Sequence, residues 1–161
     1  MHSASEVDEA AAEMMVEGAA DRSGAIWNPM AVACWSLVFT PVFGAYLLMR
    51  NWETLGEPRQ AARARVWFCF SLGLLGVQVL SAAINQRLNS ESNLMHWLGL
   101  GYLAAWWIAA ALPQARLVRS RYGAAGYSRR SWDLALLYAV LAGLACFTIQ
   151  ASLSFLLVAA T

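Results

Sequence analysis

Few side chains in this sequence have the type and spacing that a catalytic or metal site requires. The two histidines, His2 and His96, stand far apart, and neither has a second metal ligand at a binding distance along the chain. Hydrolytic zinc sites and many haem sites use paired histidines. The patterns GxSxG, GxxxxGK[ST], HExxH and GxGxxG, which mark hydrolases and nucleotide-binding sites, are also absent. We therefore predict that the protein is not an enzyme and holds no metal or cofactor.

The other reactive or polar side chains are isolated. The cysteines form no CxxC pair, which predicts buried packing residues and neither a disulfide framework nor a zinc site: Cys34, Cys69 and Cys146. Three glutamines fall in apolar stretches, where hydrogen bonds between helices would explain them: Gln78, Gln114 and Gln150. If these amides faced a common axis, they could instead line the polar seam of a small oligomeric channel.

The composition indicates which elements must position these residues. Of the 161 residues, 60% are hydrophobic and 13% charged, against roughly 45–50% and 25% in an ordinary soluble domain. All charged residues fall outside four windows, 23–49, 66–86, 92–115 and 134–161. A bilayer core about 30 Å thick needs about 20 apolar residues of helix. We therefore predict an all-α, polytopic membrane protein with four transmembrane helices in an up-down bundle.

Prolines and small residues predict how these helices pack. The transmembrane domain covers 23–161, with spans at about 29–49, 66–85, 94–115 and 134–158. Pro41, near the middle of the first span, must break or bend it, because proline lacks an N–H and clashes with the preceding turn. Spans three and four carry small residues four positions apart, which predicts a tightly packed antiparallel pair. These packing residues are Gly101, Ala105 and Ala109 in one helix and Ala135, Ala139 and Gly143 in the other.

Tryptophan and arginine predict how the bundle sits in the membrane. Five tryptophans fall at the ends of predicted spans, where an indole prefers the headgroup level: Trp27, Trp52, Trp67, Trp97 and Trp132. Nine of the 11 arginines lie in the connections 50–65 and 116–133. The positive-inside rule makes these connections cytoplasmic, so we expect both termini in the periplasm of a bacterial inner (cytoplasmic) membrane. Anionic lipid headgroups, and not a nucleic acid, are the partners expected for these arginines.

The first 22 residues differ from the rest of the chain. They hold six acidic residues and no basic residue before Arg22, which is opposite to the basic start of a targeting peptide. Four glutamates at steps of three and four residues share one face of a predicted helix: Glu6, Glu9, Glu13 and Glu17. For 1–22 we predict an outward-facing acidic tail, partly helical or disordered, whose glutamates form a candidate surface for a basic partner.

One stretch carries a more specific pattern. It contains Asn28-Pro29, Thr40-Pro41-Val42-Phe43-Gly44-Ala45, Asn51-Trp52, Leu55-Gly56 and Pro58, ahead of an arginine-rich helix. Over about residues 28–67 the chain resembles small, largely uncharacterised four-span inner-membrane proteins of Gram-negative bacteria, with their TPxFGA and NWxxLGxP pattern. The resemblance implies a membrane protein of a class in which some members protect the producing cell from its own antibacterial toxin. It carries no catalytic residue over to this chain.

The function predicted from these features is protein recognition at the membrane. Spans with no ionisable side chain except His96 argue against ion-coupled transport, which uses charged residues inside the membrane. The leading hypothesis is an immunity protein that neutralises a toxin acting at the inner membrane or in the periplasm. The alternatives are an accessory or assembly subunit of an envelope complex, and a small oligomeric exporter or channel. The expected partners are the lipid bilayer and a protein, which is a toxin, a complex subunit or a second copy of this chain.

Overall fold

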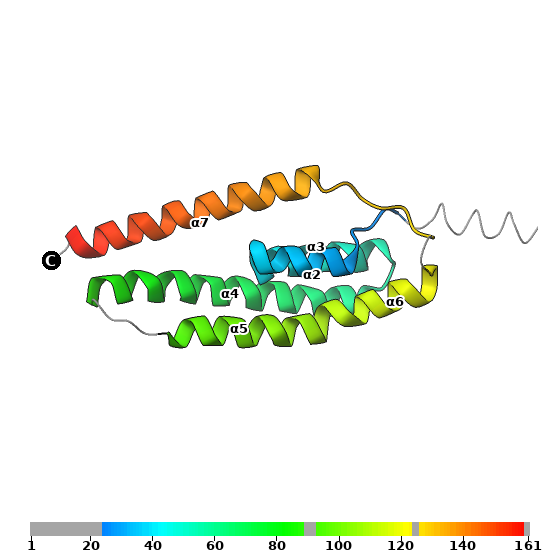
Figure 1. Ribbon diagram of the computed structural model, residues 1–161, viewed down its shortest axis with the longest axis horizontal. Helices are drawn as coiled ribbons and strands as arrows, with labels where there is room; N and C mark the ends of the chain where they lie inside the picture. The colour runs from blue at the N-terminus through cyan, green and yellow to red at the C-terminus, as the bar shows by residue number, and fades with distance from the viewer. Residues whose placement is uncertain (1–23, 89–92, 124–125, 160–161) are drawn as a thin grey trace, which may run out of the picture.

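The computed structural model describes residues 24–88, 93–123 and 126–159, and within them the chain is almost entirely helical. Three long helical segments run side by side, and two short helices lie between them at one end of the molecule (Figure 1). The long segments are α4 (Pro58–Leu88), the continuous run of α5 (Leu94–Trp106), η1 (Trp107–Ala111) and α6 (Leu112–Tyr122), and α7 (Asp133–Ala159). The short helices are α2 (Pro29–Val38) and α3 (Pro41–Thr54). The all-α prediction is confirmed for the described residues, whose one β-type contact is an isolated bridge between Ile26 and Arg129.

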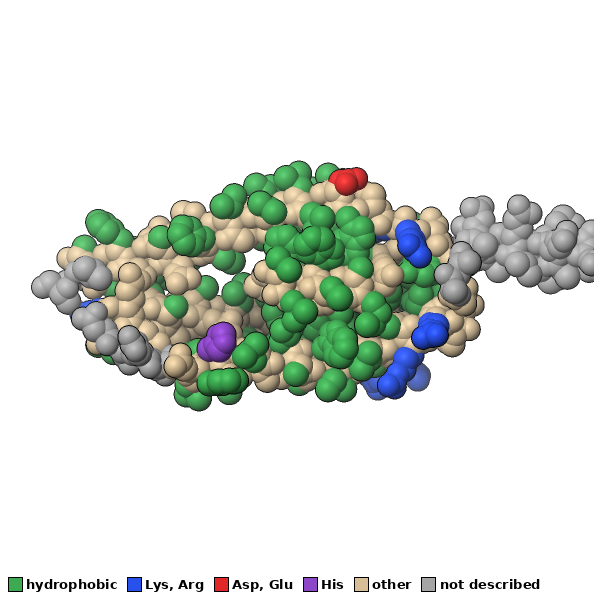
Figure 2. Space-filling model, viewed as in Figure 1, with side chains coloured by type: hydrophobic (Ala, Val, Ile, Leu, Met, Phe, Trp, Pro, Cys, Tyr) green, Lys and Arg blue, Asp and Glu red, His purple; other side chains and the backbone are tan. Residues whose placement is uncertain are grey.

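The three long segments are long and apolar enough to cross a membrane. They cover Pro58–Leu88, Leu94–Tyr122 and Asp133–Leu157, and most of their apolar residues are not buried inside the protein. At 1.5 Å per residue, even the 25-residue segment reaches about 37 Å, more than the bilayer core of about 30 Å. Apolar side chains cover much of the face shown in Figure 2. These features support a membrane protein with three spanning helices.

Residues 29–49, predicted to form the first span, instead belong to a hairpin of two short helices. Helix α3 begins at Pro41, directly after an extended Thr40. Proline disfavours a helical conformation in the residue before it and fits the first turn of a helix, where its missing N–H costs nothing. The backbone N–H of Trp27 donates to the side-chain oxygen of Asn51 at 3.0 Å, so the start of α2 and the end of α3 lie together. The prediction of four crossing helices in an up-down bundle is therefore not confirmed.

Each helix of the hairpin is shorter than the thickness of a bilayer core. Helix α2 has 10 residues, which is about 15 Å of helix and about half of the hydrocarbon core. Asn28 caps α2, because its side-chain oxygen accepts hydrogen bonds from two backbone N–H groups of the first turn. A Cβ at Gly44 would overlap the Ser36 hydroxyl and lie 2.6 Å from Trp106 Cη2. Glycine at this position therefore lets α2, α3 and Trp106 approach one another closely.

The hairpin also determines which parts of the chain lie at the same end of the molecule. The N–H of Ile26 donates to the C=O of Ser128 at 3.1 Å, and the C=O of Ile26 accepts from the N–H of Arg130 at 3.0 Å. Helix α7 then runs to the opposite end (Figure 1). The described chain therefore starts and finishes at opposite ends of the three spans. The prediction that both termini lie in the periplasm stays a prediction, since residues 1–23 and 160–161 lie outside the described part of the chain.

A π-helical turn determines which face the second long segment presents to the hairpin. The buried positions of this segment follow one another at steps of five, three and four: Trp106, Ala111, Gln114 and Val118. An α-helix keeps one face buried with steps of three and four only, so the step of five needs the wider turn of η1. This turn ends two residues before Pro113, which has no N–H for a helical hydrogen bond.

The two predicted stripes of small residues do not meet. Helix α7 packs against α4, and Ala135 joins the core that surrounds the hairpin. The second long segment contacts α4, α2 and α3. In the α7 stripe Ala135 and Ala139 are buried and Gly143 is exposed, whereas the other stripe is exposed throughout: Gly101, Ala105 and Ala109. The hairpin and α4 thus take the place beside the second long segment that was predicted for α7.

Cysteine accessibility in intact cells tests the hairpin. In a background without native cysteines, we expect Ala25→Cys and Ser128→Cys to react with an impermeant maleimide from the same side of the membrane, because Ile26 bonds directly to Ser128. Asn93→Cys, at the start of α5, should react from the opposite side. Labelling of Ala25→Cys and Asn93→Cys from one side would instead indicate a crossing helix over 29–49.

Candidate functional site

The most deeply buried amide side chains join the hairpin to the second long segment. Asn51 on α3 is 1% exposed and Gln114 on α6 is 0% exposed. Asn51 Nδ2 donates to the C=O of Trp27 at 2.8 Å and to Gln114 Oε1 at 3.1 Å. Gln114 Nε2 donates to the C=O of Leu48 at 3.0 Å. This amide pair, Asn51 and Gln114, therefore uses its hydrogen-bonding groups to hold helices together.

Trp27 belongs to the same junction. Its indole N–H donates to the C=O of Ser131 at 2.9 Å, and the guanidinium carbon of Arg130 lies 4.4 Å from the centroid of its ring. Of the other tryptophans predicted to anchor the protein at the headgroup level, Trp52 is buried, Trp67 and Trp132 are half-buried, and Trp97 is exposed. The structure thus places Trp27 and Trp52 in the protein core.

Arginine side chains gather at the end of the molecule where the hairpin closes (Figure 2). The two arginine-rich connections meet there, because Arg121 Nη2 donates to Glu57 Oε1 at 2.9 Å. Arg50 and Arg65 contact Glu53 at 2.8 Å and 3.4 Å. Exposed ion pairs of this kind contribute only about 0–1 kcal/mol each. The connections predicted to share one side of the membrane therefore do lie together, but these ion pairs are not what holds the fold.

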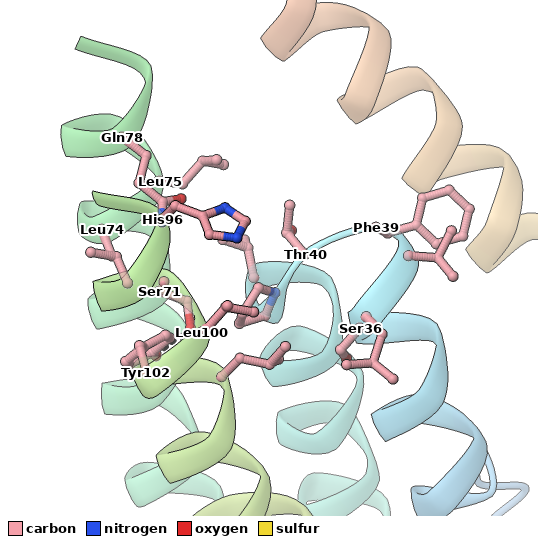
Figure 3. Close-up of a pocket in the computed structure, with 16 residues that line it drawn as sticks. Ser36, Phe39, Thr40, Ser71, Leu74, Leu75, Gln78, His96, Leu100 and Tyr102 are labelled. Atoms are coloured by element: carbon pink, nitrogen blue, oxygen red, sulfur yellow. Dashed lines mark hydrogen bonds between the residues drawn. The ribbon is translucent and has the colours of Figure 1, made fainter. Parts of the chain in front are cut away.

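A cavity of about 260 Å³ opens at the tip of the hairpin, between α4 and α5 (Figure 3). Six of its lining residues are polar: Ser36, Thr40, Ser71, Gln78, His96 and Tyr102. Ser71 Oγ and Tyr102 Oη lie 2.6 Å apart, and the C=O of Trp67 is within hydrogen-bonding distance of both. Non-helical backbone at membrane depth is tolerated where it is buried or lines such a cavity, and extended Thr40 does so here.

The chemistry that this cavity offers is limited. His96 is the one imidazole among its lining side chains. A histidine acts in nucleophilic or metal-dependent catalysis together with a nucleophile, a carboxylate or further ligands. The described part of the chain contains no group of three His, Cys, Asp or Glu residues that could hold a metal ion. The lining of this cavity presents hydroxyl, amide and imidazole groups that can form hydrogen bonds with a small polar group.

The three glutamines considered as a polar seam lie in three different places. Gln114 is in the amide pair, Gln78 lines the cavity at the hairpin tip, and Gln150 lines a recess with Gln86 and Ser154. Within one copy of the chain they do not face a common axis. The two cysteines Cys34 and Cys69 are exposed and Cys146 is half-buried, so the prediction of buried packing cysteines is wrong for the first two.

The pattern that carries the resemblance builds the hairpin. Asn28 caps α2, Thr40 and Pro41 form its turn, and Gly44 allows the close contact with α2. Gly56, just after α3, has a φ of +70°, a conformation that glycine adopts without steric cost. The hydrogen bond between helices predicted for Gln114 is confirmed. Sequence reasoning missed the role of Trp106, which packs closely against Gly44.

No family model, curated protein or solved structure matches the chain. The resemblance over residues 28–67 therefore stays a prediction. The glutamates of the acidic tail lie outside the described residues: Glu6, Glu9, Glu13 and Glu17.

Replacing Asn51 tests the role of the amide pair. In Asn51→Leu the N–H and C=O of Trp27 and the side-chain oxygen of Gln114 lose their partner, so we expect the free energy of unfolding to fall by about 2–4 kcal/mol. The matched control is Asn85→Leu, since Asn85 is half-buried on α4 and its side chain makes no hydrogen bond to another described residue. The control substitution should lower the free energy of unfolding by less than about 1 kcal/mol. Unfolding by denaturant in detergent micelles measures both, and equal losses would contradict the role given to Asn51.

Proposed function

We propose that this protein acts by recognition inside the membrane and not by catalysis. The observation that supports this most directly is an unpartnered face of the second long segment, which we call the outer face of α5. It is formed by exposed residues at steps of four and three: Leu94, Leu98, Gly101 and Ala105. A Cβ at Gly101 would meet nothing within 4 Å. Small residues on such a face let a second helix approach closely, which is what favours helix association in lipid.

The buried polar groups fit the same proposal. Asn51, Gln114, Ser71 and Tyr102 all hydrogen-bond within the protein. Side chains that are committed to internal bonds are not available to act on a substrate. What this chain presents to its surroundings is apolar surface with close-packing positions, and such a surface fits a transmembrane helix of a partner.

The partner that we propose is an antibacterial toxin that acts at the inner membrane or in the periplasm, so that the protein serves as an immunity protein. The arginine-rich end would then face the cytoplasm by the positive-inside rule, which leaves the junction of α4 and α5 toward the periplasm. The support is the motif resemblance over residues 28–67 together with the outer face of α5. A second candidate, favoured by the same face, is an accessory or assembly subunit of an envelope complex.

The outer face of α5 can be blocked without disturbing the fold. We expect Gly101→Leu to weaken capture of the partner helix about tenfold or more, because a branched side chain prevents close approach. Gly73→Leu on α4 is the matched control, since a Cβ at Gly73 also meets nothing within 4 Å. Affinity purification from the native host in mild detergent, with quantification of co-purified membrane proteins, provides the measurement. Equal capture by both variants would remove the outer face of α5 as the docking surface.

Deleting the gene distinguishes between the two candidate functions. An immunity protein predicts that the deletion strain is killed by toxin-proficient siblings and that a copy of the gene with Gly101→Leu fails to restore protection. An assembly subunit predicts loss of a larger envelope complex on native gels with unchanged survival beside the same siblings. Unchanged survival together with an intact set of membrane complexes would contradict both.

A further inference from the structure

A groove runs along α7, on a part of the molecule separate from the outer face of α5. Its walls come from α3, α4 and α7, and its volume is about 690 Å³, within the roughly 300–1,000 Å³ of typical ligand sites. Most of the wall is apolar, including Phe43, Leu47, Phe68, Leu72, Leu134 and Tyr138. In a membrane protein such a groove is open to the hydrocarbon chains of the surrounding lipid.

The groove has one charged end. Arg50 and Arg130 line it where the hairpin closes, and its other lining residues are uncharged. Toward the middle of the membrane the lining continues to Thr40 at the hairpin tip and to Gly143 on α7. A molecule lying in the groove would therefore meet two positive charges at the membrane surface and apolar walls below them.

The depth of the groove corresponds to one leaflet. From Leu134 to Cys146, the lining residues on α7 cover about 18 Å at 1.5 Å per residue. One leaflet contributes about 15 Å to a hydrocarbon core of about 30 Å, and the lining residues of α3 on the opposite wall, from Val42 to Arg50, cover about 12 Å. The charged end thus lies at headgroup level when the hairpin tip lies at the bilayer midplane.

Both arginines keep N–H donors available for an anion. Arg130 is held beside the groove by its contact with the Trp27 ring, at 4.4 Å from the centroid, and it forms no ion pair with another described residue. Arg50 donates to Glu53 through Nη1, in an exposed pair that contributes little. A guanidinium carries five N–H donors, so Arg50 retains most of them.

We propose that this groove binds an anionic phospholipid of the leaflet at the arginine end. One acyl chain lies between α7 and the hairpin, and the phosphate lies between Arg50 and Arg130. Basic pockets between transmembrane helices recognise anionic headgroups, and arginine binds phosphate with paired N–H donors. A zwitterionic lipid offers the same chains but its ammonium group cancels the phosphate charge, so the two arginines select against it.

Native mass spectrometry of the full-length protein in detergent tests this site. Phosphatidylglycerol and phosphatidylcholine with identical chains are offered in equal amounts, and we expect about tenfold more bound phosphatidylglycerol. The double variant Arg50→Gln/Arg130→Gln should bind the two lipids equally. The control Arg119→Gln/Arg129→Gln removes the same charge from exposed arginines that do not line the groove, and it should keep the preference. Circular dichroism and gel filtration establish that each variant is folded.

A second pair of variants tests the apolar part of the groove. Ala142 lines the groove on α7, whereas Ala145 lies on the same helix outside the lining. We expect Ala142→Phe to reduce binding of both lipids severalfold by filling the space, and Ala145→Phe to leave it unchanged.

Three results would overturn the lipid site. They are no preference in the unmodified protein, equal loss of preference in the Arg119/Arg129 control, and unchanged binding in Ala142→Phe. Because the outer face of α5 contributes no residue to the groove, this site and the proposed partner binding can each fail alone.

Discussion

Asn51 hydrogen-bonds both the N–H and the C=O of Trp27, so the residue near the end of the hairpin is tied to the residue just before its start. In apolar surroundings no water replaces a lost backbone partner, and an unsatisfied group there is costly. The bond from Asn51 to Gln114 extends this connection to α6, and the indole of Trp27 extends it to Ser131 at the entry to α7. One amide side chain thereby connects α3 to the start of α2 and to α6, and, through Trp27, to the entry of α7.

The helical class and the break at Pro41 could be predicted from the sequence, because both follow from local properties. Hydropathy reports where the bilayer core lies, and proline sterics act on the residue next to it. The direction that the chain takes after the break is not local. It depends on Asn51 meeting Gln114, 63 residues further along the chain, and on Gly44 fitting against Trp106. Neither contact can be predicted from the positions of apolar windows. A single crossing segment was therefore the simplest interpretation of residues 29–49.

The ends of the helices, like the path of the hairpin, could not be predicted from hydropathy alone. Helix α4 begins at Pro58, ahead of the predicted start at 66, because Arg59, Arg63 and Arg65 end the apolar window without ending the helix. The long stems of arginine can lie along apolar surface while the charge stays in water. The predicted stripe of Gly101, Ala105 and Ala109 required α-helical spacing throughout the span. The π-helical turn η1 interrupts that spacing. For the groove along α7, the arginines and the apolar residues could be recognised in the sequence. Only the position of the hairpin brings Arg50 and Arg130 to the same groove.

The short hairpin also makes the molecule unequal along its length. The end where the arginines gather contains the two short helices beside the long segments, whereas the opposite end contains only long segments (Figure 1). A membrane protein of this outline would occupy more area in one leaflet than in the other. Neighbouring lipids would compensate by bending the bilayer around the broad end, so the fold of residues 29–54 would favour local curvature.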